Sequence, residues 1–395
     1  MNGRERVALA MAGREADRVP VMCQLAIGHY MLNTDIDPVD IWFTSDAFAD
    51  ALVQMQRRYR FDGILVNLPG RPDGVLDRVV SRRRTPDGQV LEFDTGERIE
   101  IPDDDNAQMK LGTSGREDRF DFFSHTLDDL DDVDRFAGYL WGTYHIPWLP
   151  GKADSGPLGE VPEYFYRAID RVRTLTAGEV AIHGEVFSPF THFMELVGYE
   201  SALTNLVIDP QKAHAILDRL TTASITWAVG QARRGVDAVL ISSAFAGGPL
   251  LSPDYYRDFV LPYETRLASA VKREGVRVYT HTCGAIGDRL DLLVATGTEG
   301  VDTLDPPPLG SVELAEAKAQ IGDQVFLKGN MNSVALLQMQ TADEVLAHAT
   351  DRIVNGSPGG GYILSSACSI APGVEPWKLE LLTPLAEKIG SYARR

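Results

Sequence analysis

The chain has 395 residues, of which 44% are hydrophobic and 24% charged, an ordinary balance for a folded protein with a large core. Its formal net charge of −18 argues against nucleic acid, which selects basic surfaces, and against anionic membranes. Three cysteines are too few for a disulfide framework, and no run of about 18 apolar residues predicts a membrane span. We therefore expect a soluble, cytoplasmic protein. The net charge does not argue against a small-molecule substrate or a protein partner.

The N-terminal third predicts helices and strands with one long interruption. In chain order, the expected elements are a helix over 4–13, a strand over 19–25, a helix over 46–60 and a strand over 63–67. Residues 79–101 alternate polar and apolar side chains around Pro86-Asp87-Gly88, which predicts a two-stranded ribbon. A stretch rich in Gly, Pro and Ser at 152–162 predicts a surface loop.

From residue 180 onward, strands and helices alternate regularly. The expected strands cover 180–184, 238–242, 276–283, 301–305, 325–329 and 361–367, and the expected helices cover 210–234, 253–274, 288–295, 342–354 and 374–392. Eight strands alternating with helices predict an α/β fold, a (β/α)₈ TIM barrel with a parallel sheet. We expect one domain over 1–395, with an insertion at about 79–160 after the second strand. A doubly wound open sheet is the alternative, but no Gly-x-Gly-x-x-Gly follows the first strand.

One strand end carries a pattern that points to chemistry. His281-Thr282-Cys283 closes the strand that begins at residue 276, and residues two apart in a strand face the same side. Cys368 ends another apolar run. One nitrogen and two sulfurs are donors that zinc prefers, and three protein ligands leave a fourth position open, as in catalytic sites. The ordinary alternative is that each cysteine is a small buried hydrophobe.

Other polar residues fall at strand ends of the predicted barrel, where barrel enzymes carry their functional groups. These residues are Asn67, Glu185, Asp305 and Asn330. Their common position strengthens the metal-site interpretation, because His281, Cys283 and Cys368 fall at the same end.

Several segments resemble the uroporphyrinogen decarboxylase superfamily, and within it the zinc-dependent methyltransferases related to the methylcobalamin:coenzyme M methyltransferases. The segments that carry this resemblance are 235–239, 243–247 with 251–253, 327–332, and 361–364 with 370–374. The resemblance covers most of the chain and is weakest between residues 70 and 160. It implies the same barrel fold.

Departures from the decarboxylases favour the methyltransferase branch. The decarboxylases resembled here carry an R-Q-A-G-R segment after the first strand, whereas residues 23–28 contain no arginine. Asn67 stands near the place of their strand-end aspartate, and Cys368 stands where their last strand ends in histidine. A tetrapyrrole decarboxylase remains an alternative function, but these substitutions remove the groups that would orient its substrate.

The methyltransferase branch resembles the chain at its zinc motif, H-x-C followed later by a second cysteine. The resemblance implies that His281, Cys283 and Cys368 are zinc ligands and take part in catalysis. Glu185 is our first choice for a fourth, carboxylate ligand. Asp305 is the second choice, because a glutamate at about that place serves in cobalamin-independent methionine synthase; its structural alternative is a helix cap.

The implied activity is methyl transfer between a methyl-corrinoid and a small acceptor or donor such as a thiol, a folate or a methyl ether. No D-x-H-x-x-G motif is present, so the corrinoid (cobalamin) is expected on a separate protein or free in solution. Cofactor contacts are predicted for Asn67, Phe187, Phe245 and Asn330. A non-catalytic tetrapyrrole- or corrinoid-binding protein is the alternative from another class. The direction of transfer stays open, and a homodimer is compatible with a barrel of this size.

Overall fold

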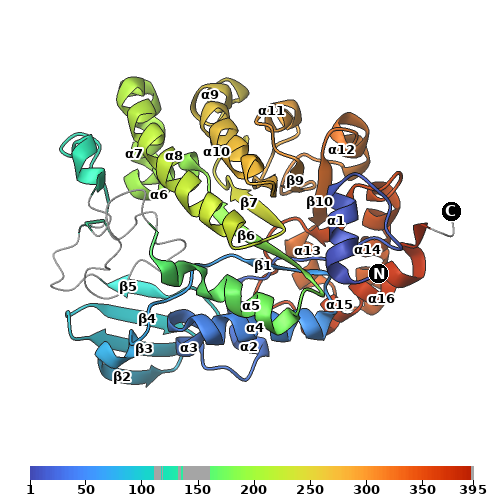
Figure 1. Cartoon of the computed structure of the whole chain (residues 1–395), viewed down its shortest axis with the longest axis horizontal. Helices are drawn as coiled ribbons and strands as arrows, with labels where there is room; N and C mark the ends of the chain where they lie inside the picture. Colours follow the sequence, from blue (N-terminus) through green and yellow to red (C-terminus); the bar gives the residue numbers. More distant parts are fainter. Residues whose placement is uncertain (111–116, 118, 132–134, 137–160, 393–395) are drawn as a thin grey trace.

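A curled sheet of parallel strands forms the centre of the protein (Figure 1). The computed structural model describes residues 1–110, 117, 119–131, 135–136 and 161–392. The strand order is β1 (Gly63–Val66), β6 (Ala181–Phe187), β7 (Ala238–Ser242), β8 (Arg277–His281), β9 (Gly300–Thr303), β10 (Phe326–Met331) and β11 (Tyr362–Ser366). Nearly every residue of these strands is buried, as expected for a parallel sheet that is covered on both faces.

An extended segment, residues 20–25, lies between the first and last strands of this sheet. On one side Val21 and Leu25 form parallel bridges with Leu364 and Ile370. On the other side the backbone N–H of Asp62, just before β1, donates to the carbonyl of Val21 at 2.8 Å. The segment completes the barrel, so the TIM-barrel prediction is confirmed. The expected first strand over 19–25 is not a regular strand, because its pairing with β11 is interrupted between the two bridges.

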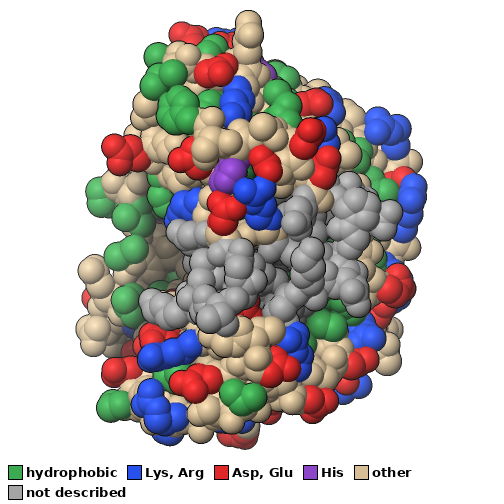
Figure 2. Space-filling view, turned by 90° about the vertical axis from the view of Figure 1, so that its left-hand side faces the viewer, with side chains coloured by type: hydrophobic (Ala, Val, Ile, Leu, Met, Phe, Trp, Pro, Cys, Tyr) green, Lys and Arg blue, Asp and Glu red, His purple; other side chains and the backbone are tan. Residues whose placement is uncertain are grey.

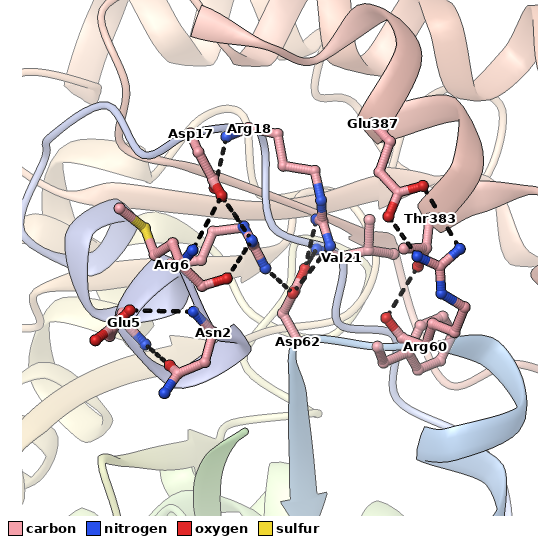
Figure 3. Close-up of polar contacts among 12 residues, drawn as sticks. Asn2, Glu5, Arg6, Asp17, Arg18, Val21, Arg60, Asp62, Thr383 and Glu387 are labelled. Carbon is pink, nitrogen blue, oxygen red and sulfur yellow. Dashed lines mark hydrogen bonds and ion pairs between the residues drawn. The ribbon is translucent and has the colours of Figure 1, made fainter. Parts of the chain in front are cut away.

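Asp62 is the centre of a buried ion cluster that ties this seam together (Figure 3). Its carboxylate accepts hydrogen bonds from Arg6 Nη1 at 2.6 Å, from Arg18 Nη1 at 2.7 Å and from the backbone N–H of Val21 at 2.8 Å. The three charged side chains are at most 10% exposed. Because Arg6 lies on α1 (Gly3–Met11), the cluster fixes the N-terminal helix to the start of β1.

Helices surround the sheet on its outer side (Figure 1). They include α4 (Ser45–Tyr59), α5 (Arg167–Thr176), α8 (Pro210–Arg233), α10 (Leu261–Arg273), α12 (Leu314–Ile321), α14 (Ala342–Gly356) and α16 (Leu382–Ile389). Further helices are α2 (Ile27–Asn33), α3 (Pro38–Phe43), α6 (Pro189–Val197), α7 (Tyr199–Ile208), α9 (Pro253–Phe259), α11 (Leu290–Ala295), α13 (Ser333–Gln338) and α15 (Pro376–Glu380). Among the described residues, no helix is both long enough and apolar enough to cross a membrane.

Two helices that the sequence predicts as continuous are each divided in two. The predicted helix over 253–274 is interrupted at Val260, just before Pro262, and the predicted terminal helix over 374–392 is interrupted at Leu381, three residues before Pro384. Proline lacks the N–H that would continue a preceding helix and is tolerated in a first turn, which explains both breaks.

The insertion after β1 is an antiparallel sheet of four strands, which lies at the lower left of Figure 1. Its strands are β2 (Val79–Thr85), β3 (Gly88–Phe93), β4 (Arg98–Pro102) and β5 (Gln108–Lys110). A ribbon at this place is confirmed, but the expectation of two strands over 79–101 is wrong. The turn at Pro86-Asp87 is correct; a second turn, around Gly96 with φ +80°, was not predicted. Much of the predicted insertion beyond residue 110, and the predicted loop except 161–162, lies outside the described residues.

The interior of the barrel is apolar at one end and polar at the other. Val7, Ala10 and Met11 of α1 pack with inward-facing residues of the strands. The strand residues in this apolar group are Leu65, Ala181, Ala238, Leu240, Tyr279, Phe326 and Ile363. Because α1 fills this end, the polar side chains two positions further along the strands face the opposite, C-terminal end of the barrel.

Candidate metal centre

Three potential metal ligands meet where β8 and β11 end. His281 is the last residue of β8, Cys283 follows two positions later, and Cys368 lies two positions after β11. The Nε2 atom of His281 lies 3.3 Å from the Sγ atom of Cys283, and the two sulfur atoms are 3.9 Å apart. All three donor atoms lie within 4.8 Å of one another. The structure therefore brings together the three residues that the sequence predicts as ligands.

The spacing of these donor atoms fits a tetrahedral zinc site. Bonds of about 2.3 Å to sulfur and about 2.0 Å to nitrogen separate two sulfur ligands by about 3.8 Å, and a nitrogen and a sulfur by about 3.6 Å. The observed distances of 3.9 and 3.3 Å are close to these values. His281 is buried, while both cysteines are partly exposed, so a fourth position is reachable from one side. The donor set and its geometry fit zinc with an open coordination position.

Glycines allow the loop that carries Cys283 to turn at this place. Gly284 follows the cysteine with φ +79°, a conformation that other residues adopt only under strain. A Cβ atom at Gly247, in the loop after β7, would lie 2.2 Å from the carbonyl oxygen of Cys283. Both positions require glycine for the β8 loop to fold beside the β7 loop.

The second ring nitrogen of His281 faces hydrogen-bonding groups from β9. Its Nδ1 atom lies 2.7 Å from the Oγ1 atom of Thr303 and 3.3 Å from an oxygen of Asp302. Both oxygens of Asp302 lie 3.1 Å from the Nζ atom of Lys328 on β10. A histidine whose Nδ1–H donates to such groups presents Nε2 as the free ligand atom, as metal-binding histidines do.

The metal-free centre favours charge separation among its ligands. Burial alone would lower the pKa of His281, but the hydrogen bond to Asp302 and the contact with Cys368 raise that pKa to about 10. The hydrogen bond from the Cys283 thiol and the neighbouring imidazolium hold the pKa of Cys368 well below its usual value. The same hydrogen bond and burial raise the pKa of Cys283. A thiolate beside an imidazolium is an arrangement that a metal cation can replace.

Glu185 lies near the three ligands without joining their cluster. It is on β6, only 4% exposed, and neither of its carboxylate oxygens has a hydrogen-bond partner among the described residues. Burial raises its pKa to about 7, with the positive charge of His281 opposing that rise. A buried carboxylate without a partner costs free energy unless hydrogen bonds, an opposite charge or a metal ion offset that cost. Its role as a fourth ligand stays a prediction.

Asp305 is placed differently. Its Oδ2 atom accepts a hydrogen bond of 2.7 Å from the backbone N–H of Gly284. The side chain is 5% exposed, and burial raises its pKa. Asp305 therefore supports the loop that carries Cys283, and the helix-cap alternative is not observed: the next helix, α12, begins at Leu314.

The four predicted cofactor contacts occupy different environments. Asn67 follows β1 and is partly exposed, and Phe245 is partly exposed beside Tyr199, with ring centroids 5.0 Å apart. Phe187 is 4% exposed and packs on a histidine ring. Asn330 is fully buried and donates to the carbonyl of Leu304 at 2.8 Å. Contact with a cofactor stays a prediction for all four, with Asn67 and Phe245 the more accessible.

Sequence reasoning missed Asp302, Thr303 and Lys328. All three are at most 1% exposed and lie at the barrel end that holds the metal ligands. The signal was present, because Asp302 and Lys328 are charged residues inside otherwise apolar strand segments. A charge at such a position is rarely buried unless it is paired.

The end of the molecule opposite α1 is hollowed (Figure 2). Hydrophobic side chains lie along one side of the hollow, at the left of Figure 2. Exposed large hydrophobic residues occur in the segments that follow β6, β7, β9 and β10, namely Tyr199, Leu250, Tyr255, Leu309, Val334 and Leu337. This is the end of the barrel at which the strands carry the candidate ligands.

Comparison with known proteins supports the resemblance seen in the sequence. A uroporphyrinogen decarboxylase of Thioalkalivibrio sulfidiphilus is 29% identical over 237 residues, which cover 58% of this chain and 65% of that protein. A methylated-thiol–coenzyme M methyltransferase of Methanosarcina mazei is 27% identical, over 63% of this chain and 60% of that protein. A methylcobamide:CoM methyltransferase of Methanosarcina acetivorans is 23% identical, over 69% and 74%. The matches thus span less than two thirds of the first two relatives.

A solved structure shows the same fold along nearly the whole chain. The structure of a methyltransferase from Methanosarcina mazei superimposes with a TM-score of 0.70 and 20% identity, covering 98% of this chain and 99% of that one. Residues 153–389 match the family described as Uroporphyrinogen decarboxylase (URO-D), and this match includes all three candidate ligands. The chain therefore belongs to the uroporphyrinogen decarboxylase (URO-D) family.

Proposed function

We propose that the protein is a zinc-dependent methyltransferase that moves a methyl group between a methyl-corrinoid and a small acceptor or donor, such as a thiol, a folate or a methyl ether. The observation that supports it best is the cluster of His281 Nε2, Cys283 Sγ and Cys368 Sγ within 4.8 Å at the C-terminal end of the barrel. Three ligands of this kind leave a position for a substrate.

The residues of the chain divide the work at this site. His281, Cys283 and Cys368 would hold the metal, and two thiolates would balance its charge. When bound, zinc would supply a Lewis acid that keeps a thiol substrate deprotonated at neutral pH, where a free thiol is mostly protonated. Glu185 would supply the fourth, carboxylate ligand of the resting site.

The corrinoid is proposed to arrive on a separate protein or free in solution. Two relatives are named as coenzyme M methyltransferases, one of them acting on a methylcobamide and the other on a methylated thiol. The hydrophobic side chains along one side of the hollow provide a surface on which a corrinoid carrier would bury apolar area (Figure 2). Phe245 and Asn67, at this end of the barrel, are the proposed first contacts.

Decarboxylation of a tetrapyrrole is the second candidate, because several relatives are named uroporphyrinogen decarboxylases. The residues support it less. The segment over 20–25 and the start of α2 contain no arginine that would bind substrate carboxylates, and Cys283 and Cys368 have no evident part in that reaction. Passive binding of a corrinoid is a third alternative, for which an open three-ligand metal site has no use.

The test is the metal content of the purified protein and of two cysteine variants. About one zinc per chain is expected in the wild type and in Cys23→Ala, since Cys23 lies outside the cluster, whereas Cys368→Ala should lose most of it. Demethylation of methylcobalamin by added thiols, followed by absorbance, then tests the reaction, and uroporphyrinogen serves as the competing substrate. A wild-type protein that holds no zinc after reconstitution would contradict the proposal.

A further inference from the structure

The imidazole of His281 is held from behind by a chain of buried groups. Thr303 Oγ1 and Asp302 Oδ2 face its Nδ1 atom at 2.7 and 3.3 Å, and Lys328 Nζ contacts both oxygens of Asp302 at 3.1 Å. All four side chains are at most 5% exposed. Burying an ammonium and a carboxylate costs free energy, and apolar side chains of similar volume in their place would stabilise the fold equally well. The chain of groups ends at the proposed metal ligand.

Thr303 reaches the imidazole from an unfavourable backbone conformation. Its φ is +77° and that of Leu304 is +53°. The N–H of Leu304 donates to the carbonyl of Asp302 at 3.1 Å, which makes a three-residue turn around Thr303. A β-branched residue with positive φ is a genuine outlier, so local preference does not explain this turn. Strain of this kind gathers at functional sites.

The surrounding residues hold the turn in place. Asn330 Nδ2 donates to the carbonyl of Leu304 at 2.8 Å, and Arg352 Nη1 donates to the side-chain oxygen of Asn330 at 3.0 Å. A Cβ atom at Gly329 would lie 2.7 Å from the carbonyl oxygen of Thr303, so β10 packs directly against the turn. Asp305, two residues after Thr303, accepts a hydrogen bond from the backbone N–H of Gly284 and so supports the loop that carries Cys283. One short segment, residues 303–305 at the end of β9, thus contacts His281 and the glycine that follows Cys283.

We infer that Lys328, Asp302 and Thr303 are positioning residues, which orient His281 so that Nε2 points at the two sulfur atoms and keep it there before a metal binds. The inference rests on the proposed zinc site and deepens it. Asp302 and Thr303 accept from Nδ1–H, so Nε2 is the nitrogen that faces the two sulfur atoms and becomes the ligand atom when a metal replaces its proton. Lys328 acts through Asp302: it balances the carboxylate, so the groups behind the histidine add no net charge to a centre of one zinc and two thiolates.

The test compares zinc affinity, measured by competition with a chromogenic chelator, among variants of these three residues. Thr303→Val keeps the shape and removes the hydroxyl, and Asp302→Asn keeps the shape and removes the charge; each should weaken zinc binding roughly tenfold or more. Thr303→Ser restores the hydroxyl and should bind zinc within about twofold of the wild type. The matched control is Glu264→Gln. Glu264 is a buried carboxylate on α10 that accepts a hydrogen bond from the Tyr256 hydroxyl, so its replacement should leave zinc affinity unchanged.

A double-mutant cycle tests whether Lys328 acts through Asp302. Lys328→Met should weaken zinc binding in the wild type and have little further effect in Asp302→Asn, because coupled residues are not additive. The cobalt-substituted protein gives a second readout, since a reoriented histidine shifts its visible absorption bands. Equal zinc affinity in Thr303→Val and Thr303→Ser would overturn the inference and leave the proposed function standing. A wild type without zinc affinity would overturn both. If Asp302→Asn does not fold, comparing the zinc affinities of the two Thr303 variants still tests the inference.

Discussion

The Sγ atoms of Cys283 and Cys368 lie 3.9 Å apart, although 85 positions separate the two residues in the chain. One follows β8 and the other follows β11, and two strands lie between them in the sheet. The pair is close only because the barrel is closed. A metal bound there therefore links the folding of distant strands, and binding to the native state alone stabilises that state.

Removing the metal should lower the stability of the protein. With zinc at about 100 times its dissociation constant, the free energy of unfolding should rise by about 2.7 kcal/mol. Thermal unfolding with and without a strong chelator measures this difference. Cys283→Ser, which lacks a ligand, should show the same unfolding temperature in both conditions. An equal response of the wild type and this variant to the chelator would contradict a metal at this site.

Glu185→Gln should separate stability from metal binding. Among the described residues, neither buried carboxylate oxygen of Glu185 has a hydrogen-bond partner, and burial raises the pKa of Glu185 to about 7. At pH 8 the metal-free wild type carries this unpaired charge, so the amide should raise the unfolding free energy by about 1–3 kcal/mol. Zinc affinity should fall if Glu185 is the fourth ligand. Unchanged affinity in Glu185→Gln together with a loss in Asp305→Asn would assign that ligand to Asp305.

Glu264 should make stability depend on pH between about 4.5 and 7. Its side chain is fully buried, and burial raises its pKa from 4.5 to about 7. Folding therefore favours the protonated form of Glu264. The stabilisation that this provides is fully present below pH 4.5 and is lost as the pH rises to about 7. Over this range the free energy of unfolding should fall by roughly 3 kcal/mol. Denaturant unfolding of Glu264→Gln across this range should show a flatter profile than the wild type. Parallel profiles would refute the assignment.

The buried cluster around Asp62 should be important for stability. Asp62→Asn leaves Arg6 and Arg18 facing an uncharged group in the interior, which should cost about 3–5 kcal/mol. Asp17 also binds Arg6 but is 44% exposed, so Asp17→Asn should cost about 1 kcal/mol or less. Urea unfolding of the two variants measures the contrast. Similar losses in both would show that Asp62 has no special place in the seam.

The barrel was predictable because buried parallel strands are continuous apolar runs that alternate with helices. The four-stranded insertion was only half predicted, since β5 has three residues and too little pattern to recognise. The first strand was predicted as regular because its side chains are apolar, but backbone pairing, which the sequence does not show, is interrupted there. Helix breaks before Pro262 and Pro384 were visible in the sequence and were overlooked.

The clustering of His281, Cys283 and Cys368 was predictable because zinc donors are few in kind and their spacing is distinctive. Their supporting residues were not. Asp302 and Thr303 act through a turn whose positive φ values no local pattern indicates, and Lys328 lies in a strand where its partner is known only from the register of β9 and β10. Asn330 lies near a strand end, as a ligand contact would, and its side chain also donates a hydrogen bond to the carbonyl of Leu304 in that turn, which the sequence did not indicate.

The seam formed by residues 20–25 also sets the order of events during synthesis. These residues leave the ribosome well before their partner β11 and before Cys368, which follows β11. During synthesis, residues 20–25 therefore stay unpaired and the candidate ligand set stays incomplete until β11 and Cys368 have emerged. The proposed metal site would form only after that point, and a product truncated before β11 would lack both the closing strand and Cys368.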